Sequence, residues 1–173
     1  MKPRLLDLFC GAGGAGMGYH RAGFDVVGVD LNPQPRYPFE FHQADALDYA
    51  REHGREFDAI HASPPCQAYS LASRQWRIRG RKYPVLIAKT RELLNAMAKP
   101  FVIENVPGAP LINPTVLYGT MFGLMTMRPR LFETSFAIPM CWRRHAMESL
   151  QRWVAWLVLG NISTSRETVD RGE

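Results

Sequence analysis

Cys66 stands in a segment that suits nucleophilic chemistry. Residues 63–70 read Ser-Pro-Pro-Cys-Gln-Ala-Tyr-Ser and directly follow a β-rich run. The two prolines stiffen the approach to the thiol, which attacks well at neutral pH only where dipoles or cations favour the thiolate. A buried structural cysteine is the usual alternative. Because a polar loop fixed by proline favours a reactive cysteine, we predict that Cys66 is a nucleophile.

An acid and two cations follow further along the chain. Glu104 lies near the end of the apolar run 101–106, where a carboxyl group can share a proton with a bound base. Arg128 and Arg130 occupy alternate positions, so on a strand their guanidinium groups project from one face and suit a carbonyl or a phosphate. Taken singly, Glu104 is better explained as a solvated strand end, and surface arginines are the default explanation of the pair.

A glycine-rich segment points to a bound small molecule. Residues 7–16 end a β-rich run and enter a helix, and Gly11, Gly13 and Gly16 have the G-x-G-x-x-G spacing. Such a turn lets the backbone approach a ligand at a helix N-terminus. Asp30 ends the next run, where an acid can hold ribose hydroxyls. The pattern alone does not separate NAD from S-adenosylmethionine, and a purely structural turn stays open.

Asp45 has two equally good interpretations. It follows the third β-rich run, where its carboxylate can accept a hydrogen bond from an adenine amino group. It can equally cap the helix predicted over residues 46–54.

A basic segment follows the cysteine loop and contains no acid. Its five cations are Arg74, Arg77, Arg79, Arg81 and Lys82. Together with the net charge of +5, this segment predicts a loop that contacts nucleic-acid phosphates. A solvated basic loop without a partner is the alternative.

These residues need a scaffold, and the chain supplies an alternation of strands and helices. Strands are predicted at residues 4–9, 25–30, 57–62, 101–106 and 128–134, and helices at 14–23, 46–54 and 84–100. The alternation predicts an α/β fold, mainly a parallel sheet with helices on both faces. The 173 residues suit one domain, and no apolar stretch reaches a membrane span, so we expect a cytoplasmic protein without membrane contact. The pairing of Cys141 with His145 is too isolated to predict zinc, and no metal is expected.

The glycine-rich segment, the cysteine loop, the acid and the arginine pair follow one another along the chain as in the DNA cytosine-5 methyltransferase family, which the chain therefore resembles. The resemblance covers residues 4 to about 132 and rests on Asp-Leu-Phe-Cys-Gly-Ala-Gly-Gly, Pro-Pro-Cys-Gln, Glu-Asn-Val and Arg-Pro-Arg. It implies a Rossmann-like methyltransferase fold that binds S-adenosylmethionine, releases S-adenosylhomocysteine and acts on DNA by flipping the target base. The family places the cysteine, the acid and the arginine pair in catalysis, which here are Cys66, Glu104, Arg128 and Arg130.

The resemblance also assigns residues to cofactor and nucleic acid. The cofactor residues are Phe9, Gly11, Ala12, Gly14, Asp30, Leu31, Asp45, Ala46 and Pro65. The nucleic-acid residues are Gln67, Ser70 and the five cations of the basic segment. The chain departs from the family where Asp30-Leu31 stands in place of Glu-Trp, and where Thr126 replaces a glutamine.

The C-terminal region departs most from the family. We expect a catalytic domain at residues 1–140 and a short segment at 141–173, which is a minimal or vestigial recognition region, truncated or partly disordered. A second chain that supplies missing elements is one interpretation. RNA methylation, a silent nucleic-acid-binding remnant and a nicotinamide-dependent oxidoreductase are the alternative functions.

Overall fold

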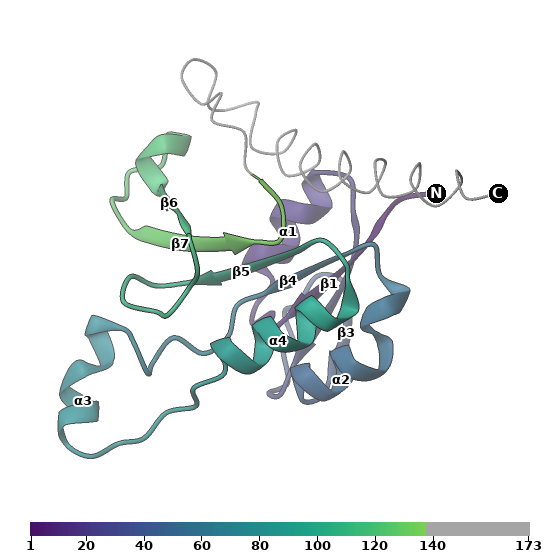
Figure 1. Cartoon of the computed structure of the whole chain (residues 1–173). Coiled ribbons are helices and arrows are strands. Elements are labelled where there is room, and N and C mark those ends of the chain that lie inside the picture. The colour runs from purple at the N-terminus through teal and green to yellow at the C-terminus, as the bar shows by residue number, and fades with distance from the viewer. Residues whose placement is uncertain (138–173) are drawn as a thin grey trace.

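The computed structural model describes residues 1–137, which form a seven-stranded sheet flanked by helices (Figure 1). The strands are β1 (Arg4–Leu8), β2 (Asp25–Asp30), β3 (Glu40–Gln43), β4 (Ala59–Ala62), β5 (Phe101–Asn105), β6 (Thr115–Tyr118) and β7 (Pro129–Thr134). Their order across the sheet is β3-β2-β1-β4-β5-β7-β6. Neighbouring strands from β3 to β5 are parallel, whereas β7 runs antiparallel to both β5 and β6. The predicted fold class is therefore confirmed.

Helices connect the strands. They are α1 (Gly14–Arg21), α2 (Ala46–His53), α3 (Arg74–Ile78) and α4 (Ile87–Met97), with short 3-10 turns η1 (Gly54–Glu56), η2 (Leu71–Ser73) and η3 (Gly119–Phe122). Within residues 1–137, no helix is both long enough and apolar enough to cross a membrane. The predicted segment 141–173, with Cys141 and His145, lies outside the described residues.

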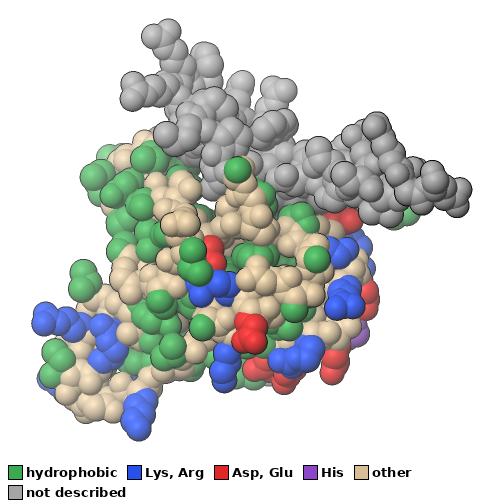
Figure 2. Space-filling view, viewed as in Figure 1, with side chains coloured by type: hydrophobic (Ala, Val, Ile, Leu, Met, Phe, Trp, Pro, Cys, Tyr) green, Lys and Arg blue, Asp and Glu red, His purple; other side chains and the backbone are tan. Residues whose placement is uncertain are grey.

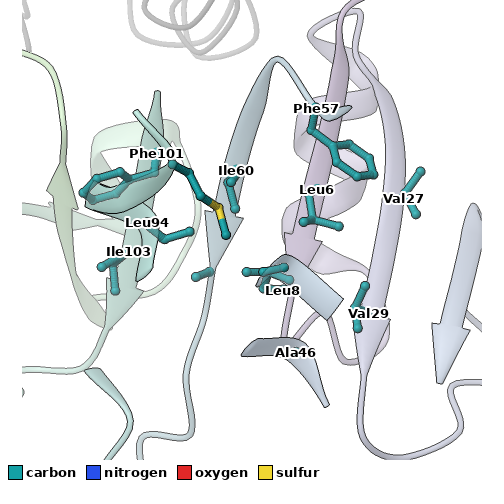
Figure 3. Close-up of a cluster of buried hydrophobic side chains, with 13 residues drawn as sticks. Leu6, Leu8, Val27, Val29, Ala46, Phe57, Ile60, Leu94, Phe101 and Ile103 are labelled. Atoms are coloured by element: carbon teal, nitrogen blue, oxygen red, sulfur yellow. The ribbon is translucent and has the colours of Figure 1, made fainter. Parts of the chain in front are cut away.

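Alternate residues of the central strands point to opposite faces of the sheet and pack in two separate hydrophobic clusters. Leu6 and Leu8 of β1 face the side of the sheet that α2 and α4 cover. The larger core on this side also contains Phe57, Ile60, Leu94 and Ile103 (Figure 3). Leu5, which precedes Leu6, faces the other side and packs with Tyr19 of α1. Since the central strands are buried on both faces, the sheet is covered on both sides, as a parallel sheet requires.

A buried ion pair joins α4 to β7. Arg91 donates from Nε to Glu133 Oε1 at 2.5 Å and from Nη2 to Glu133 Oε2 at 2.7 Å. The same Nη2 donates to the carbonyl of Pro110, and Glu133 Oε2 also accepts from the backbone N–H of Ile112. Hydrogen bonding to Glu133 raises the pKa of Arg91. The pair therefore holds β7 and the loop after β5 against α4.

Two sequence expectations needed correction. The basic segment was expected to be a loop, but it contains η2 and α3, which begin after Ser70 caps Ala72 N–H with its hydroxyl. No glycine or proline interrupts residues 71–79, so a helical turn forms there. Strand β6 was not predicted, because it is only four residues long and half-exposed at the sheet edge. Strand β3 was expected only as a run before Asp45, without bounds. The strands and helices with predicted bounds are confirmed, with ends that differ by up to three residues.

We predict that Arg91→Ala destabilises the protein by about 3 kcal/mol, because it leaves the buried Glu133 carboxylate without its cation. Chemical denaturation monitored by circular dichroism measures the change. Lys89→Ala, on the exposed side of the same helix, is the matched control and should change the free energy of unfolding by less than about 0.5 kcal/mol. Equal effects of the two substitutions would contradict this account.

Candidate active site

The loop that carries Cys66 is held at the carboxyl end of β4. Ser63 N–H donates to the carbonyl of Leu8, and Asn105 Nδ2 at the end of β5 donates to the carbonyl of Pro64 at 2.9 Å. The Cys66 carbonyl accepts from two backbone N–H groups further along the loop, both at 2.9 Å. Cys66 is half-buried. The sequence motif therefore forms a tethered turn, and its thiol lies on a loop fixed to two strands.

Glu104 lies on the neighbouring strand and has a partner on each carboxylate oxygen. Arg130 Nε lies 2.8 Å from Oε1, and the Ser63 hydroxyl donates to Oε2 at 2.9 Å. The pairing with Arg130 arises because β7 runs antiparallel beside β5. The sequence predicts the three charged residues of this site, but the ion pair of Glu104 with Arg130 becomes visible only in the structure. Arg128, by contrast, is exposed just before β7.

A series of buried, hydrogen-bonded polar side chains leads from the protein interior to Glu104, and the sequence motifs do not predict it. His61 lies two residues before Ser63, and its Nε2 is 2.8 Å from the Ser63 hydroxyl. Its Nδ1 is 3.0 Å from the hydroxyl of Tyr19 on α1. Burial lowers the pKa of His61 to about 4 and raises that of Tyr19. The available signal was a histidine inside a short apolar strand, two residues from a serine on the same face.

The glycine-rich loop adopts a left-handed backbone that sequence alone only partly predicts. Gly11 and Gly13 have φ of 49° and 87°, and Phe9, a bulky residue, has φ of 58°. The Asp30 carboxylate accepts from Gly11 N–H at 3.1 Å and from Asn32 N–H at 3.0 Å. Asp30 therefore ties the loop after β1 to the loop after β2, and its remaining lone pairs stay available to a ligand.

The predicted cofactor residues lie at or just after the carboxyl ends of four parallel strands, β1, β2, β3 and β4. A Cβ built on Gly11 or Gly14 meets no atom within 4 Å, so the loop has open space on this side. Leu31 is 66% exposed next to Asp30. Asp45 caps α2, accepting from Leu47 N–H and Asp48 N–H through Oδ1. The capping interpretation of Asp45 is thus confirmed, while a contact with adenine stays a prediction.

The remaining predicted cofactor residues differ in exposure. Ala12 is exposed in the glycine-rich loop, Ala46 is buried at the start of α2, and Pro65 is half-buried beside Cys66.

Tyr37 packs beneath the glycine-rich loop, against glycines of two elements. A Cβ on Gly28 in β2 would collide with the Tyr37 ring, so only glycine admits this packing. The Tyr37 hydroxyl donates to Asp7 Oδ2 at 3.2 Å. Asp7 is fully buried, and its Oδ1 has no hydrogen-bond partner among the described residues. Burial raises the pKa of Asp7 to about 7, although hydrogen bonds from Tyr37 and Gly16 oppose the shift.

The basic segment forms a lobe that projects from the body of the protein and carries α3 (Figure 1). Lys and Arg side chains gather on this lobe in Figure 2. Arg79 stacks on Trp76, and Arg81 stacks on Tyr83, each 5.3 Å from the ring centroid. Arg77 differs from the others, because its Nη1 donates to the carbonyls of Gln67 and Ser70 at 2.8 and 2.7 Å.

Arg77 therefore fastens the lobe to the cysteine loop. Arg74 and Lys82 are exposed, as is the Gln67 side chain, while Ser70 is half-buried.

Known proteins match most of this chain. A family model for the C-5 cytosine-specific DNA methylase matches residues 3–115. The chain is 30% identical over 124 residues to Type II methyltransferase M.AquIA of Picosynechococcus sp., an alignment that covers 62% of this chain and 50% of that protein. It is 29% identical over 123 residues to Type II methyltransferase M.XorII of Xanthomonas oryzae pv. oryzae, covering 62% and 29%. The chain thus spans half or less of these relatives, and they give no support for a second chain.

Solved structures share the fold. The S. pombe Dnmt2 methyltransferase aligns with a TM-score of 0.55 at 17% identity, covering 78% of this chain and 49% of that one. The Entamoeba histolytica methyltransferase EhMeth aligns with a TM-score of 0.55 at 16% identity, covering 84% and 58%. At these identities the likeness shows the fold alone.

We predict that Asp7 makes stability depend on pH. Because its pKa is raised from 3.8 to about 7 on folding, the protonated carboxyl stabilises the fold at low pH, and this contribution is lost as pH rises from about 4 to 7. The stability of Asp7→Asn relative to the unchanged protein should therefore increase by about 2 kcal/mol between pH 5 and pH 8. Denaturant unfolding at both pH values measures it.

Asp25→Asn, an exposed change on β2, is the matched control. A difference between Asp7→Asn and the unchanged protein that stays constant with pH would contradict the prediction.

Proposed function

Because the chain belongs to the family of C-5 cytosine-specific DNA methylases, we propose that it transfers a methyl group to C5 of cytosine in DNA through Cys66. The observation that carries the proposal is the junction of the cysteine loop with Glu104. The Ser63 hydroxyl donates to Glu104 Oε2, and Asn105 donates to the Pro64 carbonyl, so the loop that carries the nucleophile is hydrogen-bonded to the strand that carries the acid. Family membership also favours S-adenosylmethionine over NAD for the glycine-rich loop.

In the proposed reaction, Cys66 activates an otherwise poor nucleophile. Cytosine C5 does not attack a methyl donor readily, but addition of the thiolate to C6 forms an S–C6 bond and moves an electron pair toward C5. Glu104 shares a proton with N3 and accepts from the N4 amino group, which relieves the charge that opposes this addition. Arg130 lies on the far side of the carboxylate from Ser63 and is suited to the base carbonyl O2.

The predicted cofactor residues suit the nucleoside part of S-adenosylmethionine. Asp30 keeps lone pairs for ribose hydroxyls, and the open side of Gly11 and Gly14 leaves room beside it. When bound, S-adenosylmethionine supplies a methyl group from its sulfonium and leaves as S-adenosylhomocysteine. The exposed Leu31 offers adenine an aliphatic surface rather than an aromatic ring.

Product release restores the chain to its starting state. After C5 has gained the methyl group, a base removes the C5 proton, its electron pair re-forms the C5–C6 double bond, and the S–C6 bond breaks to release Cys66 as thiolate. Atoms and charges then balance with one proton released.

The basic lobe is proposed to hold the DNA. C6 of cytosine is shielded inside a duplex, so the base must leave the stack at a cost of a few kcal/mol. Arg74, Arg79, Arg81 and Lys82 are the cations of the lobe available for phosphates. Arg77 instead hydrogen-bonds the lobe to the backbone of the cysteine loop.

The test is methyl transfer by the full chain from labelled S-adenosylmethionine to mixed-sequence duplex DNA, with structured RNA in parallel. We expect label in 5-methylcytosine of DNA. Cys66→Ser should lower the rate at least about 1,000-fold, and Glu104→Gln about 100-fold, because each removes a group that acts on the reacting base.

Cofactor binding and thermal unfolding of each variant serve as the controls for folding. Transfer to RNA but not DNA would overturn the DNA assignment, and full activity of Cys66→Ser would overturn the mechanism.

A further inference from the structure

A chain of three uncharged side chains ends on the proposed active-site carboxylate. It runs from Tyr19 on α1 to His61 on β4, then to Ser63 and to Glu104 on β5, with successive distances of 3.0, 2.8 and 2.9 Å. Tyr19 is 8% exposed and His61 is 2% exposed, so the chain crosses the interior of the protein. Sequence motifs assign no role to His61 or Tyr19.

When Glu104 is ionised, only one assignment of donors and acceptors satisfies all the hydrogen bonds of this chain. The carboxylate only accepts, so the single proton of Ser63 is committed to Oε2. Ser63 must then accept from His61 Nε2–H, which leaves Nδ1 as an acceptor for the Tyr19 O–H. The whole chain is thus consistent with one neutral tautomer of His61. An aligned series of dipoles points its positive end at Glu104.

Burial keeps the side chains of His61 and Tyr19 uncharged. Asp7 of β1 pairs in register with His61, Tyr19 approaches from α1, and Glu104 with Arg130 lies at the far end. Burial lowers the pKa of His61 to about 4, so the ring is uncharged at neutral pH. Burial also raises the pKa of Tyr19, so its hydroxyl keeps its proton.

We propose that His61 is a positioning residue that acts through Ser63 to fix the orientation of the Glu104 carboxylate toward the target base. The inference rests on the proposed function, because it assigns Glu104 to that base. Ser63 holds one oxygen and Arg130 holds the other, so rotation of the carboxylate is restricted, while each oxygen retains a lone pair for the base. His61 supplies the hydrogen bond that keeps the Ser63 hydroxyl aimed at Oε2.

The first test reads the tautomer and needs no activity. In the full chain labelled with nitrogen-15, two-bond proton–nitrogen correlations report which ring nitrogen of each histidine is protonated. His61→Gln identifies the signals by their disappearance. We expect a neutral His61 ring protonated at Nε2 from pH 5.5 to pH 8. A ring protonated at Nδ1, or a charged ring, overturns the chain.

The second test separates positioning from structural support by the effect on kcat and KM. Ser63→Ala and His61→Leu should each lower kcat for methyl transfer about tenfold while KM changes by less than about twofold. His61→Gln keeps an N–H donor of similar reach and should recover kcat to within about threefold. The double variant Ser63→Ala/His61→Leu should be no slower than Ser63→Ala alone, because His61 acts on Glu104 only through Ser63.

The outcomes separate this inference from the proposed function. An unchanged kcat in Ser63→Ala, no recovery in His61→Gln, or multiplied losses in the double variant each overturn the positioning role. If the unchanged protein transfers no methyl group, the proposed function fails and the positioning role fails with it. The tautomer measurement then still decides whether the hydrogen-bonded chain exists.

Discussion

The hydrogen bonds that join the ends of β4 and β5 are the constraint on which the rest of the site depends. Parallel pairing sets Ala62 beside Ile103. The residues that follow them, Ser63 and Glu104, therefore lie close enough for the Ser63 hydroxyl to donate to the Glu104 carboxylate. Asn105 then holds the Pro64 carbonyl at the same edge. A loop and a strand from distant parts of the sequence become one rigid unit. Every role proposed for the thiol and the carboxylate assumes that unit.

The carboxylates of Glu104 and Glu133 are each paired with an arginine. Tyr19 and His61 are buried and uncharged, whereas Glu104 and its partner Arg130 are partly exposed. Such an arrangement avoids the large cost of an unpaired buried charge. The antiparallel strand β7 brings Arg130 to the site, and the Arg91–Glu133 pair anchors that strand. Stability and site geometry therefore share one element.

Local patterns were enough to predict most of the fold. Apolar runs bounded by glycine and proline predict the central strands, and the motif at Asp45 predicts both a helix start and its cap. Long-range pairings were not predictable in the same way. The ion pair of Glu104 with Arg130 requires knowledge that β7 inserts beside β5, and the chain through His61 requires α1 to lie over β4. Spacing along a sequence does not encode such contacts.

Covalent trapping of the target base shows directly whether Cys66 is the nucleophile. The full chain is incubated with S-adenosylmethionine and mixed-sequence duplex DNA that contains 5-fluorocytosine, whose C5 fluorine cannot leave as a proton does. The account predicts a protein–DNA adduct that survives denaturation and maps to Cys66 by mass spectrometry. An unchanged protein that methylates ordinary DNA yet forms no adduct, or an adduct at another residue, would contradict it.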